Sequence, residues 1–531
     1  MTTSDATAPP PAPRKNLRDA LLDALRSLPG TREFHIHVLQ SSPRRNQTLY
    51  RFAKPRPRAY VQDILVLLSE QIAPDGPRVL VTAIEASLYH IPTTSSAILY
   101  VCKVDSTGQT SGANGRSPTK KLVQAFLNYY ANPRTRPVGG VQHLWIQLFA
   151  RAQGQYLFPN SAMWEGKKPL SDVKLCAWWK RVLAQVALDI QKPTIGSEET
   201  TTFKAYYILP GYSELEAEYS LKVVSSEVAW EYGHPYTLQE LPCPPDNPNT
   251  RNLGHYIPYF EDDPKSRFMD EIAYTTGGEV KSPVRKRART ATSVDETRQR
   301  EEKDRDNGKE KEKEKTEKDD RPLGELGKVT ADEFWERMSF RQECVAGAVT
   351  GFFTLVVSTK ADPEVHVGKN SSSPLEPQAG QVSSQIIKRV LAALTTGVEF
   401  STAERAIKAT ETLESTIKRL CDGISSTGGP GQQHRSRTPE PRERSNSTLL
   451  VPPRTPPRND RQEQEVTPNP FPEPVASLET YRSHIYGTVW VRNAEEERGQ
   501  GGGQGGEKGK LAVGGPAVTV LTARKKKKRG E

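Results

Sequence analysis

Cysteine, methionine and long apolar runs are scarce in this 531-residue sequence. The five cysteines form no C-x-x-C pair, so neither a disulfide framework nor a zinc site is indicated. Hydrophobic residues make up only 35% of the chain, and no run approaches the roughly 18 apolar residues of a membrane-spanning helix. The start, MTTSDATAPPPAPRK, lacks the apolar segment of a signal peptide. We therefore expect a soluble intracellular protein in a reducing compartment, with no metal.

Proline and positive charge are abundant instead. The 42 prolines and the low apolar content predict that a sizeable fraction of the chain is disordered. The net charge of +10 is clustered, as in RKRAR (285–289) and RKKKKR (524–529), which suits a polyanionic setting such as chromatin. Such clusters serve nuclear import equally well. We expect direct DNA binding not to be the primary activity.

Composition divides the chain into ordered and disordered parts. We predict a disordered N-terminus over 1–15, an ordered first part over 16–279 and a charged insertion over 280–327. A second ordered part follows over 328–425, and a mostly disordered tail with a basic end over 426–531. The insertion has almost no apolar residues to offset its ordering entropy. It is therefore expected to interrupt a single domain.

Helical and strand patterns alternate within the ordered parts. Apolar residues recur with helical spacing at 16–28, 119–131, 171–190, 330–358, 384–397 and 402–420. Strand patterns occupy 33–42, 78–91, 96–105 and an isolated piece in the tail, 485–493. The segment 60–72 fits either structure. This order predicts a mixed α/β (α+β) domain with a central mixed sheet surrounded by helices.

A Gly/Ser-rich loop lies between the predicted strand that ends at Asp105 and the helix at 119–131. Backbone N–H groups and the helix dipole at such a position favour a phosphate, which Arg116 and Lys120 would pair. The loop matches no P-loop or dinucleotide motif, so an ordinary flexible connection is the competing interpretation.

The turn EDDPKSR sets Asp262 and Asp263 side by side between aromatic residues, with Lys265 and Arg267 close behind. Charge clusters usually face water, so a solvated acidic turn is one interpretation. At the mouth of an apolar pocket, the same residues would handle protons, and both cations would pair with the acids.

Other polar and aromatic motifs allow two interpretations each. Trp178 and Trp179 point from neighbouring faces of a predicted helix; core packing accounts for one, and a ligand or partner for the other. Tyr156 fits a packed tyrosine on a strand edge. His35 and His37 share a strand face, but no third residue has metal-ligand spacing, so they are expected to be a packed pair.

Taken together, these motifs resemble a known family. YVCKVDSTG, LFARAQGQYLFPNS, WWKRVL, LPG and YFEDDPKSRF, in this order, are similar to the fungal histone H3 lysine acetyltransferases first named for regulation of Ty1 transposition. The likeness spans about 16–275 and resumes from EFWERMSFRQE to about 421. It implies a fold similar to the CREB-binding-protein acetyltransferases and acetyl transfer from acetyl-CoA to core and tail lysines of histone H3.

The resemblance also implies a setting. It points to a nuclear enzyme that acts on new H3–H4 histones held by chaperones of the anti-silencing and nucleosome-assembly-protein types. Replication-coupled nucleosome assembly and the DNA damage response are the implied processes.

Residue by residue, the resemblance assigns two groups. The positions that match acetyl-CoA contacts are Val104, Asp105, Ser106, the stretch 113–117 with Arg116 and Ser117, Phe149, Gln153, Lys168, Pro169, Leu170, Trp178 and Arg267. The positions that match the catalytic centre are Tyr156, Trp179, Asp262, Asp263 and Lys265, the last a buried lysine that the family acetylates on itself. Gln153, Lys168 and Pro169 depart from the family's usual residues.

The chemistry of acetyl transfer explains these residue types. A lysine amine with a pKa near ~10.4 must lose its proton before it attacks a thioester, and Asp263 can accept that proton. Tyr156 and Trp179 would supply an apolar wall around the lysine stem. Transfer is expected by direct attack in a ternary complex. The alternative is a non-catalytic nuclear scaffold for histones or nucleic acid, which the basic clusters favour but the acidic turn and tryptophan pair do not.

Overall fold

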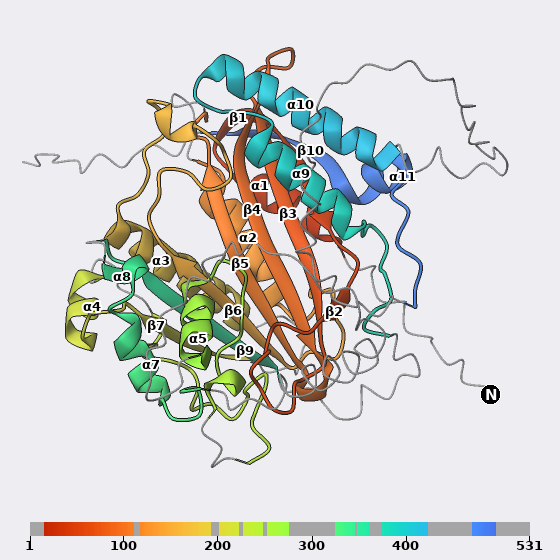
Figure 1. Cartoon of the computed structure of the whole chain (residues 1–531). Coiled ribbons are helices and arrows are strands. Elements are labelled where there is room, and N and C mark those ends of the chain that lie inside the picture. The colour runs from red at the N-terminus through yellow and green to blue at the C-terminus, as the bar shows by residue number, and fades with distance from the viewer. Residues whose placement is uncertain are drawn as a thin grey trace, which may run out of the picture. The chain divides into compact units, whose positions relative to one another are not determined.

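A ten-stranded mixed sheet organises the chain (Figure 1). The computed structural model describes residues 15–110, 117–192, 201–221, 227–247, 252–274, 324–345, 348–359, 373–422 and 470–494. The predicted site positions 113–116, nearly all of the charged insertion and the motifs RKRAR and RKKKKR lie outside these ranges.

The strands, in chain order, are β1 (Gly30–Gln40), β2 (Arg44–Asn46), β3 (Ala59–Gln71), β4 (Arg78–Ile91), β5 (Ser96–Ser106), β6 (His143–Ala150), β7 (Thr201–Ile208), β8 (Trp230–Tyr232), β9 (Gly351–Thr359) and β10 (Tyr486–Asn493). Across the sheet they run β10-β1-β3-β4-β5-β6-β9-β7-β8, with β2 on β3. The pairs β5–β6 and β7–β8 are parallel and the others antiparallel. The predicted mixed sheet is confirmed, and the segment 60–72 is a strand.

The helices are α1 (Leu17–Leu25), α2 (Thr119–Ala131), α3 (Asp172–Gln191), α4 (Glu214–Ser220), α5 (Pro264–Tyr274), α7 (Ala331–Met338), α8 (Gln342–Val345), α9 (Ser384–Thr396), α10 (Ala403–Asp422) and α11 (Leu478–Thr480). Short turns of 3-10 helix, η1 (Pro92–Thr94), η2 (Ser161–Met163) and η3 (Leu253–His255), and a π-helical turn, η5 (Tyr481–Ile485), join them. Side chains of Asn16 and Ser383 cap α1 and α9 where the sequence changes from extended to helical pattern.

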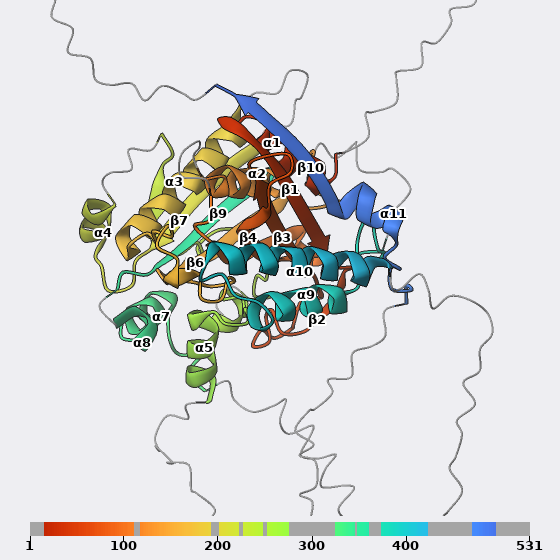
Figure 2. The ribbon, with the colours of Figure 1, turned by 90° about the horizontal axis from the view of Figure 1, so that it is seen from above.

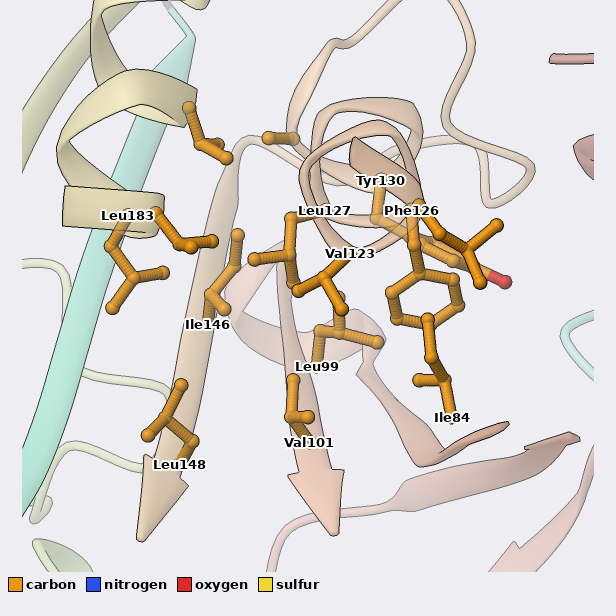
Figure 3. Close-up of a cluster of buried hydrophobic side chains, with 14 of the residues drawn as sticks. Ile84, Leu99, Val101, Val123, Phe126, Leu127, Tyr130, Ile146, Leu148 and Leu183 are labelled. Carbon is orange, nitrogen blue, oxygen red and sulfur yellow. The ribbon is translucent and has the colours of Figure 1, made fainter. Parts of the chain in front are cut away.

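The helices lie on both faces of the sheet, with α1, α2 and α3 on one and α5, α7, α9 and α10 on the other (Figure 2). On the first face, alternate residues of β5 and β6 such as Leu99 and Ile146 pack against Phe126 and Leu127 of α2 and Leu183 of α3 (Figure 3). The residues between them, among which are Tyr100 and Trp145, point to the second face.

The alternation changes at one place in β5. Glu85 of β4 pairs with Lys103 and Ala86 pairs with Val101, so the register skips Cys102. Such a bulge shifts every following side chain to the other face. Val104 consequently packs in the first-face core, and Asp105 comes to the same face as Tyr100.

Asp105 ties β5 to the loop that carries Tyr156. Its Oδ2 accepts hydrogen bonds from the backbone N–H groups of Tyr156, Leu157 and Phe158, at 2.7, 2.8 and 3.2 Å. Its Oδ1 lies 2.9 Å from the ammonium of Lys167, and both side chains are 5% exposed. The side chain of Asp105 is therefore a structural support, and only its backbone is left to meet a ligand.

Two sequence-based expectations require correction. The stretch 330–358 is not continuously helical: α7 and α8 are followed by β9, which runs between β6 and β7. The aromatic and β-branched run GFFTLVVST suits a strand, and pairing on both edges outweighs the helical spacing. The piece at 485–493 is not isolated, because β10 pairs with β1. The ordered core therefore includes β10, although we predicted that the ordered part of the chain ends at residue 425.

The two histidines of β1 are a packed pair, as expected. His37 is 1% exposed and its Nε2 lies 3.0 Å from the hydroxyl of Tyr481. His35 contacts the hydroxyl of Tyr486 at 2.9 Å and Gln71 at 3.0 Å. Burial, together with His35 and Arg78, lowers the pKa of His37 to about 3. These contacts dock the segment that precedes β10 onto the sheet.

We expect acid to destabilise the fold through His37. In the folded state it stays neutral down to a pKa of about 3, whereas in the unfolded chain it binds a proton near pH ~6.5. The unfolding free energy should therefore fall by up to about 1.4 kcal/mol per pH unit below ~6.5 from this residue alone. Denaturant unfolding of His37→Gln between pH 7 and 4 should show a shallower fall than the wild type. His484→Gln is the control, and an unchanged slope in His37→Gln would contradict the assignment.

Asp105→Ala should destabilise the protein by about 3–5 kcal/mol, because it strands the buried Lys167 ammonium and three backbone donors. Denaturant unfolding measures the loss, with Asp75→Ala in the exposed β3–β4 turn as control. A loss below about 1 kcal/mol would show that the loop is held by other contacts.

Candidate active site

A groove of about 820 Å³ crosses the second face of the sheet. Its floor includes Glu85 of β4 and Tyr100 of β5. Lys388 of α9 stands on one side, and Asp262 and Arg267, from the turn and first residues of α5, stand on the other. The groove thus separates the two groups of helices that cover this face.

The groove brings together predicted site residues from distant parts of the sequence. Phe149, Gln153, Tyr156, Asp262 and Arg267 all line it. They come from β6, the loop after it and the turn before α5, which only the folded sheet brings into contact. The acidic turn therefore borders a groove, but this groove is lined by many polar and charged side chains and is not the apolar pocket that we considered.

The two adjacent aspartates point in different directions. Asp262 has φ 64°, a left-handed conformation that aspartate adopts more readily than most residues, and it is exposed. This turn directs Asp263 inward, where it is 0% exposed. Asp263 then starts α5, since its Oδ1 accepts the N–H of Lys265 at 2.8 Å and Pro264 takes the first helical position. The motif is therefore a helix start that buries one carboxylate and exposes the other.

Three donors converge on the Asp263 carboxylate. Besides the N–H of Lys265, the Tyr100 hydroxyl donates to Oδ2 at 3.1 Å. The Lys265 ammonium lies 3.5 Å from the same oxygen and is 7% exposed. The rings of Phe260 and Phe352 flank that ammonium at 5.7 and 5.2 Å. A charged pair with this little water is coupled strongly.

Arg267 does not pair with the acids of the turn. Its guanidinium lies 3.0 Å from Glu343 of α8 and is about half exposed. The expectation that both cations neutralise the aspartates is therefore correct for Lys265 and wrong for Arg267. The pairing joins α5 to α8 at the edge of the groove.

Tyr156 occupies the groove from the loop that Asp105 fixes. Burial raises its pKa to about 12, with a smaller opposing effect from Arg151. Its ring is thus neutral and lines the groove. Phe149 stands nearby against Phe352, with ring centroids 4.7 Å apart.

Trp178 and Trp179 are packed in the first-face core and are not among the described residues that line the groove. Their rings are nearly perpendicular, at 79°, with centroids 4.7 Å apart. Trp179 is 6% exposed. Core packing accounts for this residue without a ligand.

Some of the positions assigned to acetyl-CoA lie near the end of β5, whereas Phe149, Gln153 and Arg267 line the groove and Trp178 packs in the first-face core. Val104 and Ser106 flank Asp105 on the strand, and Ser117 precedes α2, where its hydroxyl contacts Thr119 at 3.0 Å. Lys168, Pro169 and Leu170 are exposed and directly follow Lys167, which Asp105 binds. The predicted strand-loop-helix arrangement is confirmed, although 111–116 lie outside the described residues.

Sequence reasoning missed several groove residues. Glu85, Tyr100 and Lys103 lie in the middle of strands that read as core. Burial opposes the charge of Lys103, but Glu85, 3.1 Å away, and the nearby Asp262 raise its pKa above the usual value. The polar residues interrupting the apolar pattern of β4 and β5 were the signal, and the bulge at Cys102 concealed which face they occupy.

Two searches of the described ranges bear on function classes. In them, no three His, Cys, Asp or Glu side chains are grouped as metal ligands would be. Every described helix is too short or too polar to cross a membrane.

Comparison with known proteins gives a consistent answer. Histone acetyltransferase rtt109 of Aspergillus flavus is 29% identical over 302 residues, which are 54% of this chain and 46% of that protein. Histone acetyltransferase rtt109 of Schizosaccharomyces pombe is 25% identical over 264 residues, 49% of this chain and 52% of that protein. The chain thus matches about half the length of these curated relatives. The crystal structure of Rtt109 from Aspergillus fumigatus is similar with a TM-score of 0.55 and 25% identity, covering 75% of this chain and 96% of that one.

The profile of the histone acetyltransferase KAT11-type domain matches residues 128–416. This range includes the Tyr156 loop, the acidic turn, β9, α9 and most of α10. Since the match covers more than half of the sequence, the chain belongs to the family of histone acetyltransferases with a KAT11-type domain.

Proposed function

We propose that this protein transfers the acetyl group of acetyl-CoA to lysines of histone H3. The observation that carries the proposal is the buried Asp263 carboxylate, linked to the groove through Tyr100 in a chain of this family. A buried acid beside an open groove can take a proton from a lysine that the groove holds. A scaffold that only binds histones has no need of such a group.

The end of β5 suits acetyl-CoA. The N-cap of α2 is Pro118, which offers no side-chain acceptor, and Lys120 and Lys121 stand in the first turn. Such a helix start favours phosphate groups. Leu170, which is 41% exposed, offers apolar surface for a pantetheine arm. When bound, acetyl-CoA supplies an activated thioester carbonyl.

The chain's own residues then prepare the acceptor lysine. Tyr156 and Phe149 hold the aliphatic stem of the lysine side chain, and their apolar rings limit water around the amine. Asp263 receives the proton of the ammonium, which converts the lysine into a nucleophile. Attack proceeds directly in a ternary complex. Among the described cysteines, burial raises the pKa of Cys176 to about 12, which makes its thiol unsuited to covalent catalysis.

Lys265 is proposed to be an autoacetylation site. Its ammonium is the nearest cation to Asp263, at 3.5 Å, and it is buried together with that carboxylate. Acetylation would remove this charge and leave Asp263 facing only hydrogen-bond donors. Because Lys265 is buried, another enzyme would have little access to it. Acetylation by this protein's own active site is therefore the better explanation.

The proposed substrates are core and tail lysines of H3 in new H3–H4 histones, presented by chaperones of the anti-silencing and nucleosome-assembly-protein types. The proposed setting is the nucleus, in replication-coupled nucleosome assembly and the DNA damage response. The support is the sequence resemblance, the names of the two relatives and the basic clusters of the chain.

Incubation of the full chain with labelled acetyl-CoA and H3–H4, with and without a histone chaperone, tests the proposal. Label on H3 is expected. Tight histone binding without label in any arm would instead favour the scaffold.

Asp263→Asn should lower kcat by at least about 10²-fold, because the amide fills the same space but accepts no proton. The melting temperature should fall as well, because the buried Lys265 ammonium loses its charged partner. Steady-state kinetics with H3 measures the change. Asp332→Asn, at a side chain of α7 that is 94% exposed, is the matched control. Turnover near that of the wild type in a folded Asp263→Asn variant would exclude proton transfer to this residue.

Trp179→Ala should destabilise the protein by about 3–5 kcal/mol, because it empties a buried core position. Trp179→Phe should retain most of the stability and activity. Melting curves and acetylation rates of both variants measure this. An active site wall without a core role would instead give Trp179→Ala an unchanged melting temperature and a raised KM.

A further inference from the structure

Tyr100 is the residue through which the groove reaches Asp263. Asp263 is 0% exposed and does not belong to the described lining of the groove, whereas Tyr100 does. The hydroxyl of Tyr100 donates a hydrogen bond of 3.1 Å to Asp263 Oδ2. Tyr100, which is 5% exposed, therefore lies between the groove and the carboxylate.

The hydroxyl is held in place by the packing of its ring. The ring of Tyr100 stacks on Phe260 with centroids 3.9 Å apart and planes 9° from parallel. Phe260 is itself 1% exposed, and its N–H donates to the Ser266 hydroxyl at 2.8 Å. A tyrosine fixed in this way presents its oxygen at one position, as a proton relay requires.

We propose that Tyr100 relays the proton of the acceptor lysine to Asp263. The inference rests on the acetyl transfer proposed above. The lysine ammonium donates a hydrogen bond to the Tyr100 oxygen; as its proton moves there, the tyrosine's own proton passes to Asp263 Oδ2. Tyrosine ends unchanged, the ammonium becomes an amine and the carboxylate becomes a carboxylic acid. The amine then attacks the thioester carbonyl, the C–S bond breaks, and the leaving thiolate takes the second amine proton.

The surroundings of Tyr100 favour a concerted transfer. Burial, with Asp263 and Cys102 adding to it, raises the pKa of Tyr100 well above its usual value. The hydroxyl therefore keeps a proton at all times, and an isolated tyrosinate is not formed. Titratable groups face Tyr100 and Asp263 from every element packed against them. Lys265 lies on the α5 side, Tyr89 and Cys102 lie on the strands, and Tyr236 lies beside Asp263. Lys103 and Asp262 lie at the groove.

Tyr100→Phe tests the relay, because it removes the hydroxyl and keeps the ring stacked on Phe260. We expect kcat for H3 to fall by about 10²-fold, with the affinity for acetyl-CoA and the melting temperature nearly unchanged. Without the relay, transfer depends on amine already deprotonated by solvent. The rate of the variant should therefore rise about tenfold per pH unit toward the lysine pKa of ~10.4, while the wild type depends less steeply on pH.

Tyr50→Phe is the matched control. Tyr50 is a buried tyrosine of the same core cluster, but it is absent from the groove lining. It should keep the kcat and pH profile of the wild type. Activity of Tyr100→Phe within about threefold of the wild type, or a pH profile parallel to it, would overturn the relay.

A double variant, Tyr100→Phe with Asp263→Asn, tests the relay even if Tyr100→Phe lowers the stability of the protein. Residues that act in one relay are not additive, so Tyr100→Phe with Asp263→Asn should be no slower than Asp263→Asn alone. If the fold-loss of kcat in the double variant equals the product of the fold-losses in the two single variants, the relay is overturned. A wild type that labels no H3 in any arm would instead overturn the proposed acetyl transfer itself.

Discussion

The site depends on the bulge that β5 forms at Cys102. Before the bulge, Tyr100 points to the second face of the sheet and its hydroxyl reaches Asp263. After it, the register is shifted by one residue, so Asp105 points to that face as well and holds the backbone of the Tyr156 loop. Strict alternation would place a residue five positions later on the opposite face. One extra residue thus lets a single strand contact both the buried carboxylate of Asp263 and the backbone of the Tyr156 loop.

Both buried carboxylates are stabilised by hydrogen bonds as well as by charge. Asp105 accepts hydrogen bonds from four backbone N–H groups and from the Lys167 ammonium. Asp263 accepts the Tyr100 hydroxyl and the N–H of Lys265, and the Lys265 ammonium lies nearby. Leaving a carboxylate without such partners in the interior costs several kcal/mol. The two carboxylates differ in where their partners lie. The partners of Asp105 hold a loop in place, whereas one partner of Asp263, Tyr100, also lines the groove.

Much of the fold could be predicted because its elements follow local rules. The α1 and α3 patterns, the alternation in β1 and the start of α2 after a Gly/Ser loop all depend on residues close in sequence. What failed depends on distant pairing: β9 became a strand because β6 and β7 lie on either side of it, and β10 joined the sheet because the edge of β1 was available. The acidic turn was singled out from its own charge pattern, and Phe149 and Tyr156 were assigned through family resemblance, while Tyr100, Glu85 and Lys103 were not singled out. The face of Lys103 is decided by the bulge, which no alternation rule contains, whereas Tyr100 and Glu85 lie in apolar strand patterns that indicate core positions.

The second face of the sheet shows how the groove arises. Ile386 and Val390 of α9 pack over Leu65 and Leu67, whereas α5 and α7 pack through Phe268 and Phe334 over the other end. Because these are separate hydrophobic clusters carried by segments far apart in the chain, neither extends over the middle of β4 and β5. The polar residues there are consequently left facing solvent, and the carboxylate of Asp262 lies among them. An open groove of this kind admits a lysine on a protein chain, where a closed cavity would admit only a small molecule.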